Sequence, residues 1–463
     1  MISDATPDLP VTELAARIRE RKTTSAELTE AYLARIEKNS GRFNAFETVT
    51  ADLARREARA ADAAIRAGKY RGPLHGIPFG AKDLLDTAGI RTSWGAAPTR
   101  NRVPGRDATV IRKLHEAGAV LLGKLAMVEF AGGLGYRFAD ASASGPGRNP
   151  WNTDRWTGGS SSGSGAAVAG GLVGFALGTE TWGSILCPAA FCGITGLRPT
   201  YGRVSRAGAM VCSDSFDKIG PLAHSAADCR MILAAIAGPD ADDPTSADEP
   251  LDFAEARPLP KGLRAAIIPL DFSKVGEPEV KSAFEAAVAV LRSLGVRAET
   301  AQLPDFPAAD LAGVIITAEA LSSFEKFYRD GTVQQLTDPY APLQMEIASA
   351  MTGADLAKAW RLRAVLQRKM QEFFQRYDVI LSPNFMSVAP PIDRDLYETL
   401  PYPDPVGAIG NACGLPALAM PSGLGRERLP VSFQIMGPPW SEGLLLDLGE
   451  AYQAKTRHHL ARP

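Results

Sequence analysis

Apolar residues follow two different spacings along the chain, which predict helices that alternate with buried strands. Residues 11–21 have the spacing of a short amphipathic helix, and a second helix is expected from Thr24, with Glu27 completing a capping box. Residues 278–294 predict another helix, with an apolar side formed by Val280, Phe284, Val288 and Leu291. A short apolar run predicts a buried strand at 119–122, and two further strands are expected at 263–268 and 296–300. The alternation favours a layered α/β architecture.

The remaining segments indicate how the chain is organised. Asp107 is expected to cap a helix that runs through Glu116. Residues 140–165 are rich in Gly, Ser and Pro and predict a functional loop, because long polar loops are uncommon in compact enzymes. Residues 240–250 are acidic and predict a surface excursion, and residues 310–375 predict mostly helix. We expect one domain over 1–463, with a catalytic core at 66–230 and a more variable, largely helical substrate-side region at 240–375.

Composition and charge narrow the classes of function. The chain has 463 residues, 45% hydrophobic and 22% charged, with a formal net charge of -2, which favours neither nucleic acid nor an anionic membrane. No apolar run reaches the roughly 20 residues of a membrane span, and the first ten residues lack the apolar core of a secretory signal. The five cysteines form no C-x-x-C pair, which favours reduced thiols, a cytoplasmic location and no metal.

A serine- and glycine-rich segment at 157–199 carries the most information about chemistry. A flexible linker is one interpretation, but linkers are not normally followed at once by an apolar helix. A phosphate-binding loop is a second, but no complete phosphate-loop motif is present. The third is a catalytic loop. Residues 159–163 match G-x-S-x-G, yet no apolar strand precedes them and no histidine has a triad context, which argues against a Ser-His-Asp triad.

Several motifs together resemble the amidase signature family. The central motif at 158–164 is followed by Gly-Thr-Glu-Thr-Trp-Gly-Ser-Ile at 178–185 and by Pro-Ala-Ala-Phe-Cys-Gly at 188–193. Upstream, Lys82 and Asp83 match the family's lysine motif, and downstream the residues at 414–417 and 430–434 match its C-terminal strands. The resemblance covers nearly the whole chain and implies a mixed central β-sheet flanked on both faces by α-helices.

The resemblance also implies a Ser–cis-Ser–Lys triad with no cofactor and no metal. Carried over to this sequence, the base is Lys82, the bridging serine is Ser160 and the nucleophile is Ser184. Burial favours the neutral form of a lysine, and a neutral lysine can accept a proton from a serine hydroxyl. Main-chain N–H groups are expected to stabilise the oxyanion, with Thr181, Trp182, Gly183 and Ser184 as the candidates.

The sequence departs from the family pattern next to the nucleophile. The family commonly has Gly-Gly where this chain has Trp182-Gly183, and it often has arginine where this chain has Leu186. Trp182 is expected either to line the substrate site or to lie in the core. Substrate contacts are expected from Phe130, Gly132, Gly133 and Trp182.

These features predict an amidase that forms an acyl-enzyme on Ser184. The expected substrate is an apolar or aryl amide or a carbamate, with esterase activity as a side reaction. The expected partners are therefore a small-molecule substrate only, with no nucleic acid and no membrane, and the chain is expected to be a monomer or homodimer. The alternative is the amidase subunit of a tRNA-dependent amidotransferase complex.

Overall fold

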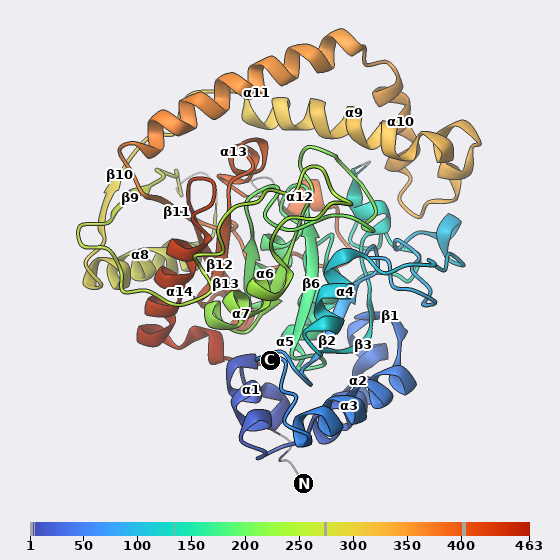
Figure 1. Ribbon diagram of the computed structural model, residues 1–463. Helices are drawn as coiled ribbons and strands as arrows, with labels where there is room; N and C mark the ends of the chain where they lie inside the picture. Colours follow the sequence, from blue (N-terminus) through green and yellow to red (C-terminus); the bar gives the residue numbers. More distant parts are fainter. Residues whose placement is uncertain (1–2, 4, 134, 273–275, 401–403) are drawn as a thin grey trace.

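The computed structural model contains one large mixed sheet at its centre (Figure 1). The structure describes residues 3, 5–133, 135–272, 276–400 and 404–463, and within them eleven strands form this sheet. In spatial order the strands are β1 (Phe46–Val49), β3 (Val120–Leu125), β2 (Pro78–Lys82), β6 (Phe175–Glu180), β8 (Lys218–Ala223), β7 (Thr195–Arg198), β12 (Ala417–Leu424), β13 (Pro430–Met436), β11 (Val379–Pro383), β9 (Arg264–Ile267) and β10 (Arg297–Thr300). A separate hairpin pairs β4 (Arg148–Asn149) with β5 (Asn152–Trp156).

Helices cover both faces of the sheet, as the sequence analysis expected. The longer ones are α1 (Val11–Arg19), α2 (Ser25–Phe43), α3 (Ala51–Arg66), α4 (Thr109–Glu116), α5 (Ser162–Ala169), α6 (Leu186–Cys192), α7 (Ala226–Ile236), α8 (Pro278–Ser293), α9 (Ala308–Arg329), α10 (Tyr340–Ser349), α11 (Gly353–Phe374) and α14 (Glu442–Thr456). Two short helices, α12 (Leu396–Thr399) and α13 (Gly407–Ala412), lie in the loop after β11. On one face Gly196 of β7 approaches Ala189 of α6, and on the other Leu418 of β12 approaches Gly449 of α14.

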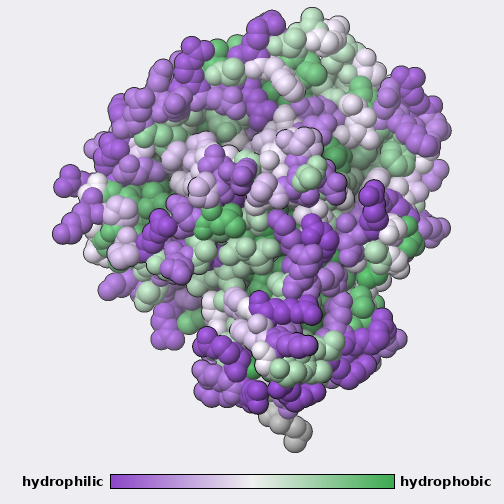
Figure 2. Space-filling model, viewed as in Figure 1, coloured by the Kyte–Doolittle hydropathy of each residue, from purple (hydrophilic) through white to green (hydrophobic). Residues whose placement is uncertain are grey.

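The two ends of the molecule in Figure 1 are helical. Helices α1–α3 form one end, and α9 and α11 run together across the opposite end. Hydrophilic residues cover much of the α1–α3 end in the space-filling view (Figure 2). In the part of the chain that the structure describes, every helix is too short or too polar to cross a bilayer.

Local sequence signals set several element boundaries correctly. The Thr24 hydroxyl accepts a hydrogen bond from the N–H of Glu27 at 3.1 Å, and the Glu27 carboxylate accepts one from the N–H of Thr24 at 3.1 Å, so the predicted capping box is present. The expected Asp107 cap is wrong. The Asp107 carboxylate accepts the N–H of Ala88 at 2.7 Å instead, and Ala108 occupies the N-cap position of α4 without a side-chain bond.

Strands β3, β2 and β6 are parallel neighbours in the sheet, and all of their residues are buried. Lys82 is the last residue of β2 and Glu180 the last residue of β6, so the two charged side chains enter the interior at neighbouring strand ends. A buried charge is tolerated only where it is paired or neutral.

Glu180 is paired. Its carboxylate accepts hydrogen bonds from Arg198 at 2.8 Å and from the Asn411 amide at 3.1 Å, and the side chains of Glu180 and Arg198 are both fully buried. Burial alone would raise the pKa of Glu180, but Arg198 and Lys218 lower this pKa to about 2. The carboxylate also accepts the N–H groups of Ile185 and Leu186 at 2.9 and 3.1 Å, which fixes the start of α6.

We expect Glu180→Gln to lower the free energy of unfolding by about 3–5 kcal/mol, because the substitution leaves the Arg198 guanidinium buried without its counter-charge. Urea denaturation monitored by circular dichroism measures this loss. Glu285→Gln is the matched control: it breaks an exposed pair with Lys281 on α8 and should change stability by less than about 1 kcal/mol. Equal effects of the two substitutions would contradict the role assigned to Glu180.

Candidate active site

Lys82 lies at the end of β2 with its side chain fully buried. Its ammonium nitrogen lies 2.8 Å from the Ser160 hydroxyl and 2.9 Å from the Thr179 hydroxyl. Burial lowers the pKa of Lys82 to about 7, although Cys212, Asp217 and Glu180 act in the opposite direction. A substantial fraction of Lys82 is therefore neutral near pH 7, and the neutral amine can accept a proton from Ser160.

Ser160 sits just before α5, in a segment where the backbone is closely surrounded. The Gly159–Ser160 peptide bond is cis. A Cβ atom on Gly159 would lie 2.8 Å from Trp156 and 3.0 Å from both Tyr136 and Val128, so glycine is required there. The Ser160 carbonyl also accepts the N–H of Val128 at 3.1 Å. These contacts hold the Ser160 hydroxyl against Lys82.

The turn between β6 and α6 carries Ser184. Gly183 has a φ of 86°, a conformation that favours glycine, and Ser184 is buried. Among the described residues, the N–H groups of Trp182, Gly183 and Ser184 have no protein acceptor, whereas the next two N–H groups bind Glu180. The turn thus presents free main-chain donors beside Ser184, the arrangement that an oxyanion requires.

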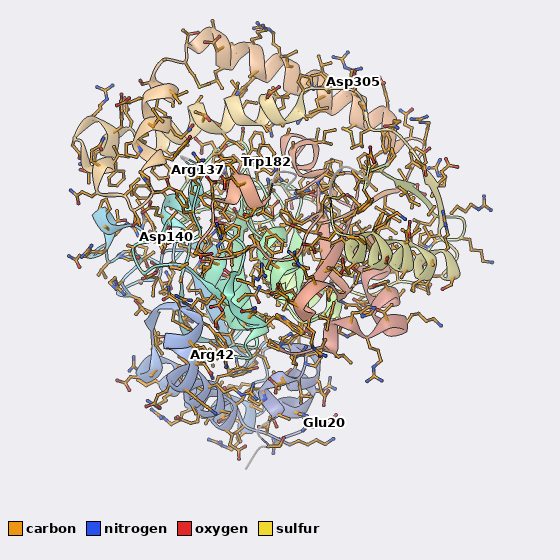
Figure 3. The ribbon with its side chains drawn as sticks, turned by 180° about the vertical axis from the view of Figure 1, so that it is seen from behind. Glu20, Arg42, Arg137, Asp140, Trp182 and Asp305 are labelled. Carbon is orange, nitrogen blue, oxygen red and sulfur yellow. The ribbon has the colours of Figure 1, made fainter. Side chains whose placement is uncertain are left out.

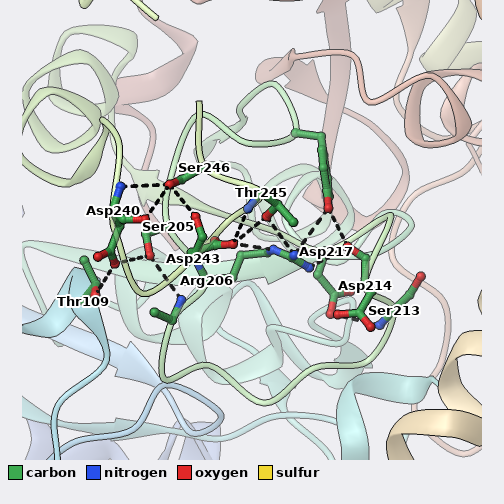
Figure 4. Close-up of polar contacts among 12 residues, drawn as sticks. Thr109, Ser205, Arg206, Ser213, Asp214, Asp217, Asp240, Asp243, Thr245 and Ser246 are labelled. Atoms are coloured by element: carbon green, nitrogen blue, oxygen red, sulfur yellow. Dashed lines mark hydrogen bonds and ion pairs between the residues drawn. The ribbon is translucent and has the colours of Figure 1, made fainter. Parts of the chain in front are cut away.

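Asp217 holds the other side of this turn. Its carboxylate accepts the Thr181 hydroxyl at 2.6 Å and the N–H groups of Cys212 and Ser213 at 2.7 and 3.0 Å. The loop that carries Asp217 is fixed in turn by Arg206, which donates to the Asp214 carbonyl at 2.7 Å and to the Thr245 hydroxyl at 2.9 Å (Figure 4). The acidic segment at 240–250, which was predicted to be a surface excursion, therefore also holds Arg206 and through it the loop that carries Asp217.

A cavity of about 610 Å³ opens beside the turn. It is lined by the candidate oxyanion residues Thr181, Trp182, Gly183 and Ser184, by the predicted substrate residues Gly132 and Gly133, and by Tyr136, Trp156, Cys187, Cys212, Ile316, Gln344, Phe385, Leu396, Tyr397, Leu400 and Asp404, among others. Gly159 also lines the cavity, so the chain next to the Lys82–Ser160 pair reaches it.

Of the residues predicted to contact substrate, Trp182 lines the cavity and Phe130 does not. Trp182 is half-buried and lines the cavity (labelled in Figure 3), so it is not a core residue. Phe130 is 1% exposed and lies outside the cavity lining, where its ring stacks on Phe324 with ring centroids 4.6 Å apart. Phe130 supports the wall from behind, and the adjacent Ala131 reaches the cavity in its place.

Sequence reasoning missed the residues that reach the cavity from the loop after β11. Asp404 is the clearest case. One of its oxygens accepts the Gln434 amide at 2.6 Å and the N–H of Val406 at 3.0 Å, and the other has no donor among the described residues. Burial raises the pKa of Asp404 to about 6. The only signal was an acidic residue in a proline-rich loop, which is typical of exposed turns.

Comparison with known proteins gives one consistent family. The family model described as Amidase matches residues 27–446. The chain is 38% identical over 97% of its length to a glutamyl-tRNA(Gln) amidotransferase subunit of Moorella thermoacetica, and the alignment covers 97% of that protein. The structure of peptide amidase from Stenotrophomonas maltophilia is similar with a TM-score of 0.88, 32% identity and coverage of 100% and 99% of the two chains. The corresponding amidotransferase subunit of Thermotoga maritima has a TM-score of 0.81, 28% identity and coverage of 100% and 98%.

These relatives correct one expectation. The sequence predicted only small-molecule partners, no nucleic acid and a monomer or homodimer. This prediction is contradicted by the similarity to subunits of glutamyl-tRNA(Gln) amidotransferases. The net charge of -2 misled because it is a sum over the whole chain. One subunit of an assembly needs no basic stripe of its own if another supplies the contact.

The family model also explains why so many separate motifs agreed. Its match begins in α2 and ends in α14, so it includes the lysine segment, the serine-rich segment and the C-terminal strands. The large mixed sheet with helices on both faces is shared with the matched amidase structures. The chain therefore belongs to the amidase signature family and is a hydrolase that acts on C–N bonds.

Proposed function

We propose that this protein hydrolyses an amide-type C–N bond through an acyl-enzyme on Ser184. The observation that carries the proposal is the 2.8 Å contact between the buried Lys82 amine and the Ser160 hydroxyl, beside a cavity that Ser184 lines. Lys82 is the base, Ser160 the relay and Ser184 the nucleophile.

In the first half-reaction, neutral Lys82 takes the proton of Ser160 while Ser160 takes the proton of Ser184. The Ser184 oxygen attacks the carbonyl carbon, and the C=O electron pair moves onto the oxygen. When the tetrahedral intermediate collapses, the C–N bond breaks and the leaving nitrogen receives a proton from Ser160, which Lys82 re-protonates. Water then attacks the ester carbonyl as it gives a proton to Ser160 and Ser160 gives one to Lys82. The bond between Ser184 and the carbonyl carbon breaks, Ser184 receives a proton from Ser160, which Lys82 re-protonates, and the acid is released.

The N–H groups of the turn at 181–184 stabilise the negative oxygen. Glu180 occupies the N–H groups of Ile185 and Leu186, so the donors that point to substrate are confined to the residues before them. Losing one such donor typically lowers the rate by about a hundredfold or more.

A serine-directed phosphonate or sulfonyl fluoride should label Ser184, as detected by mass spectrometry of the digested protein. Ser184→Ala should remove both the label and turnover, and Lys82→Met should lower kcat by at least about a thousandfold. Ser164→Ala is the matched control, since Ser164 is a buried serine of the same segment whose hydroxyl bonds the Leu177 carbonyl at 3.1 Å. A label on another residue, or full activity of Ser184→Ala, would overturn the assignment.

The value of kcat/KM should rise with pH and level off above the Lys82 pKa of about 7. The sign follows because the ammonium form, which dominates below that pKa, has no lone pair to accept a proton. Asp217→Asn removes a negative charge that favours the ammonium, so it should move the midpoint to lower pH. A profile that is flat between about pH 5 and pH 9 with a neutral substrate would contradict a lysine base.

We further propose that this protein is the amidase subunit of a tRNA-dependent amidotransferase complex. The similarity to such amidotransferase subunits over 97% of the chain supports it.

One observation favours a second candidate, hydrolysis of an apolar or aryl amide or carbamate. Trp182 stands where the family commonly has glycine, and it faces a cavity that Tyr136, Trp156 and Phe385 also line. Aromatic walls bind flat apolar groups through burial and ring stacking.

The two candidate functions can be distinguished with the purified chain alone. Its release of aniline from an aryl amide or carbamate is compared with its release of ammonia from glutamine. If Trp182 binds an aryl group, Trp182→Gly should raise KM for the aryl substrate by roughly tenfold, the effect of losing one large apolar contact. It should leave glutamine hydrolysis nearly unchanged. Ammonia release without aryl activity, together with recovery of tRNA and partner subunits on a tagged chain, would eliminate the second candidate.

A further inference from the structure

Three segments that are far apart in the sequence meet at Arg137 on the rim of the cavity. They are the residues at 129–133 and 135–137, the start of α10 and the start of α12. Each one continues directly into the cavity wall: the first into Gly132 and Tyr136, the second into Gln344, and the third into Leu396 and Tyr397. Contacts at this junction therefore determine how these parts of the wall are placed relative to one another.

Arg137 contacts the other two segments with both its main chain and its side chain. Its N–H donates to the Asp338 carboxylate at 2.7 Å, and its carbonyl accepts the N–H of Leu396 at 2.9 Å. Its guanidinium pairs with Asp395 and lies over the Tyr340 ring, with the Tyr340 hydroxyl 3.3 Å away. Arg137 and Trp182 are labelled in the same part of the molecule in Figure 3.

The α10 side of the junction is held by two buried carboxylates, those of Glu129 and Asp338. The buried Glu129 carboxylate accepts the N–H groups of Thr337 and Asp338 at 3.0 and 2.8 Å. Asp338, itself 2% exposed, then accepts the N–H groups of Arg137 and Tyr340. The guanidinium also contacts Tyr340, but the buried carboxylates of Glu129 and Asp338 hold this side without it.

The α12 side is held more weakly. Helix α12 has four residues, too few to be stable alone, and Asp395 caps it by accepting the N–H of Tyr397 at 2.9 Å. Leu396 is buried against Phe385 and its neighbours, but Tyr397 is 63% exposed although it lines the cavity. Among the described residues, α12 has two polar attachments to the rest of the rim, and both are to Arg137: the Leu396 N–H bonds the Arg137 carbonyl, and the guanidinium binds the capping carboxylate. Only the guanidinium contact is lost when the Arg137 side chain is replaced.

We propose that Arg137 is a specificity-determining residue that positions α12 over the cavity and thereby limits the size of the acyl group. The inference rests on the proposed function in that the cavity receives the substrate of Ser184. The polar partners of the Arg137 side chain are Asp395 and Tyr340, and neither belongs to the catalytic triad, so Arg137 acts through α12 and is a positioning residue. Without the guanidinium, Tyr397 and Leu396 can move outward and admit a bulkier group.

The test uses a series of anilides with one leaving group and straight acyl chains from acetyl to decanoyl. Arg137→Gln, which removes the charge and shortens the side chain, should raise kcat/KM for the longest acyl group relative to acetyl on the order of fivefold, through KM, because one part-buried ion pair is lost. Arg137→Lys should restore most of the wild-type profile. The matched control is Arg264→Gln, which breaks a 3.0 Å surface ion pair with Asp378. Neither residue lines the cavity, so the acyl-length profile should not change.

A second measurement does not depend on turnover. Hydrogen exchange of the peptide that contains α12 should be several-fold faster in Arg137→Gln, while exchange in α10 stays at the wild-type rate. An unchanged acyl-length profile, or unchanged exchange in α12, would overturn the proposal. Failure of the proposed function looks different: anilide hydrolysis would then survive Ser184→Ala, and the exchange result would still report on the attachment of α12.

Discussion

The site depends on the burial of one amine. Lys82 ends a strand whose neighbours on both sides are also buried, and water cannot solvate its ammonium there. A buried lysine either finds a counter-charge or loses its proton. Here the groups in direct contact are hydroxyls and a carbonyl, which are neutral, so the amine form becomes accessible near pH 7. The same burial that makes Lys82 difficult to charge suits it to the role of base proposed above.

The surrounding charges are arranged so that they do not cancel this effect. Glu180 ends the neighbouring strand and could have been the counter-ion of Lys82, but its carboxylate is taken by Arg198 and by the main chain of α6. Asp217 is likewise occupied by Thr181 and two N–H groups. Both carboxylates are close enough to favour the ammonium, and both use their lone pairs on the turn that carries Ser184. Two acidic groups beside the lysine thus fix the turn without forming an ion pair with the base.

The sequence predicted local features well because their causes are local. The capping box at Thr24 and the strand at 119–122 follow from residues within one or two turns of chain, and the motif around Ser160 and Ser184 fixed the segments of the site. Asp107 failed as a cap because the N–H of Ala88, from a separate loop, binds its carboxylate. Asp404 and Tyr397 could not be found, since only the folded loop after β11 brings them to a cavity whose other wall lies more than two hundred residues earlier.

The candidate site therefore has a buried part, which carries the proposed triad, and a facing wall made of loops and outer helices. The Lys82, Ser160 and Ser184 segments belong to the sheet and to the helices packed against it, where burial leaves little room for change. The facing wall comes from loops and from α9, α10 and α12, and Arg137 joins α10 and α12 through polar contacts at the rim. Substitutions there alter the shape and charge of the cavity without disturbing the amine or the turn. Proteins about a third identical to this chain include both a peptide amidase and one component of an amidotransferase. This difference is expected when the reacting groups lie in the core and the residues that select the substrate lie in the facing wall.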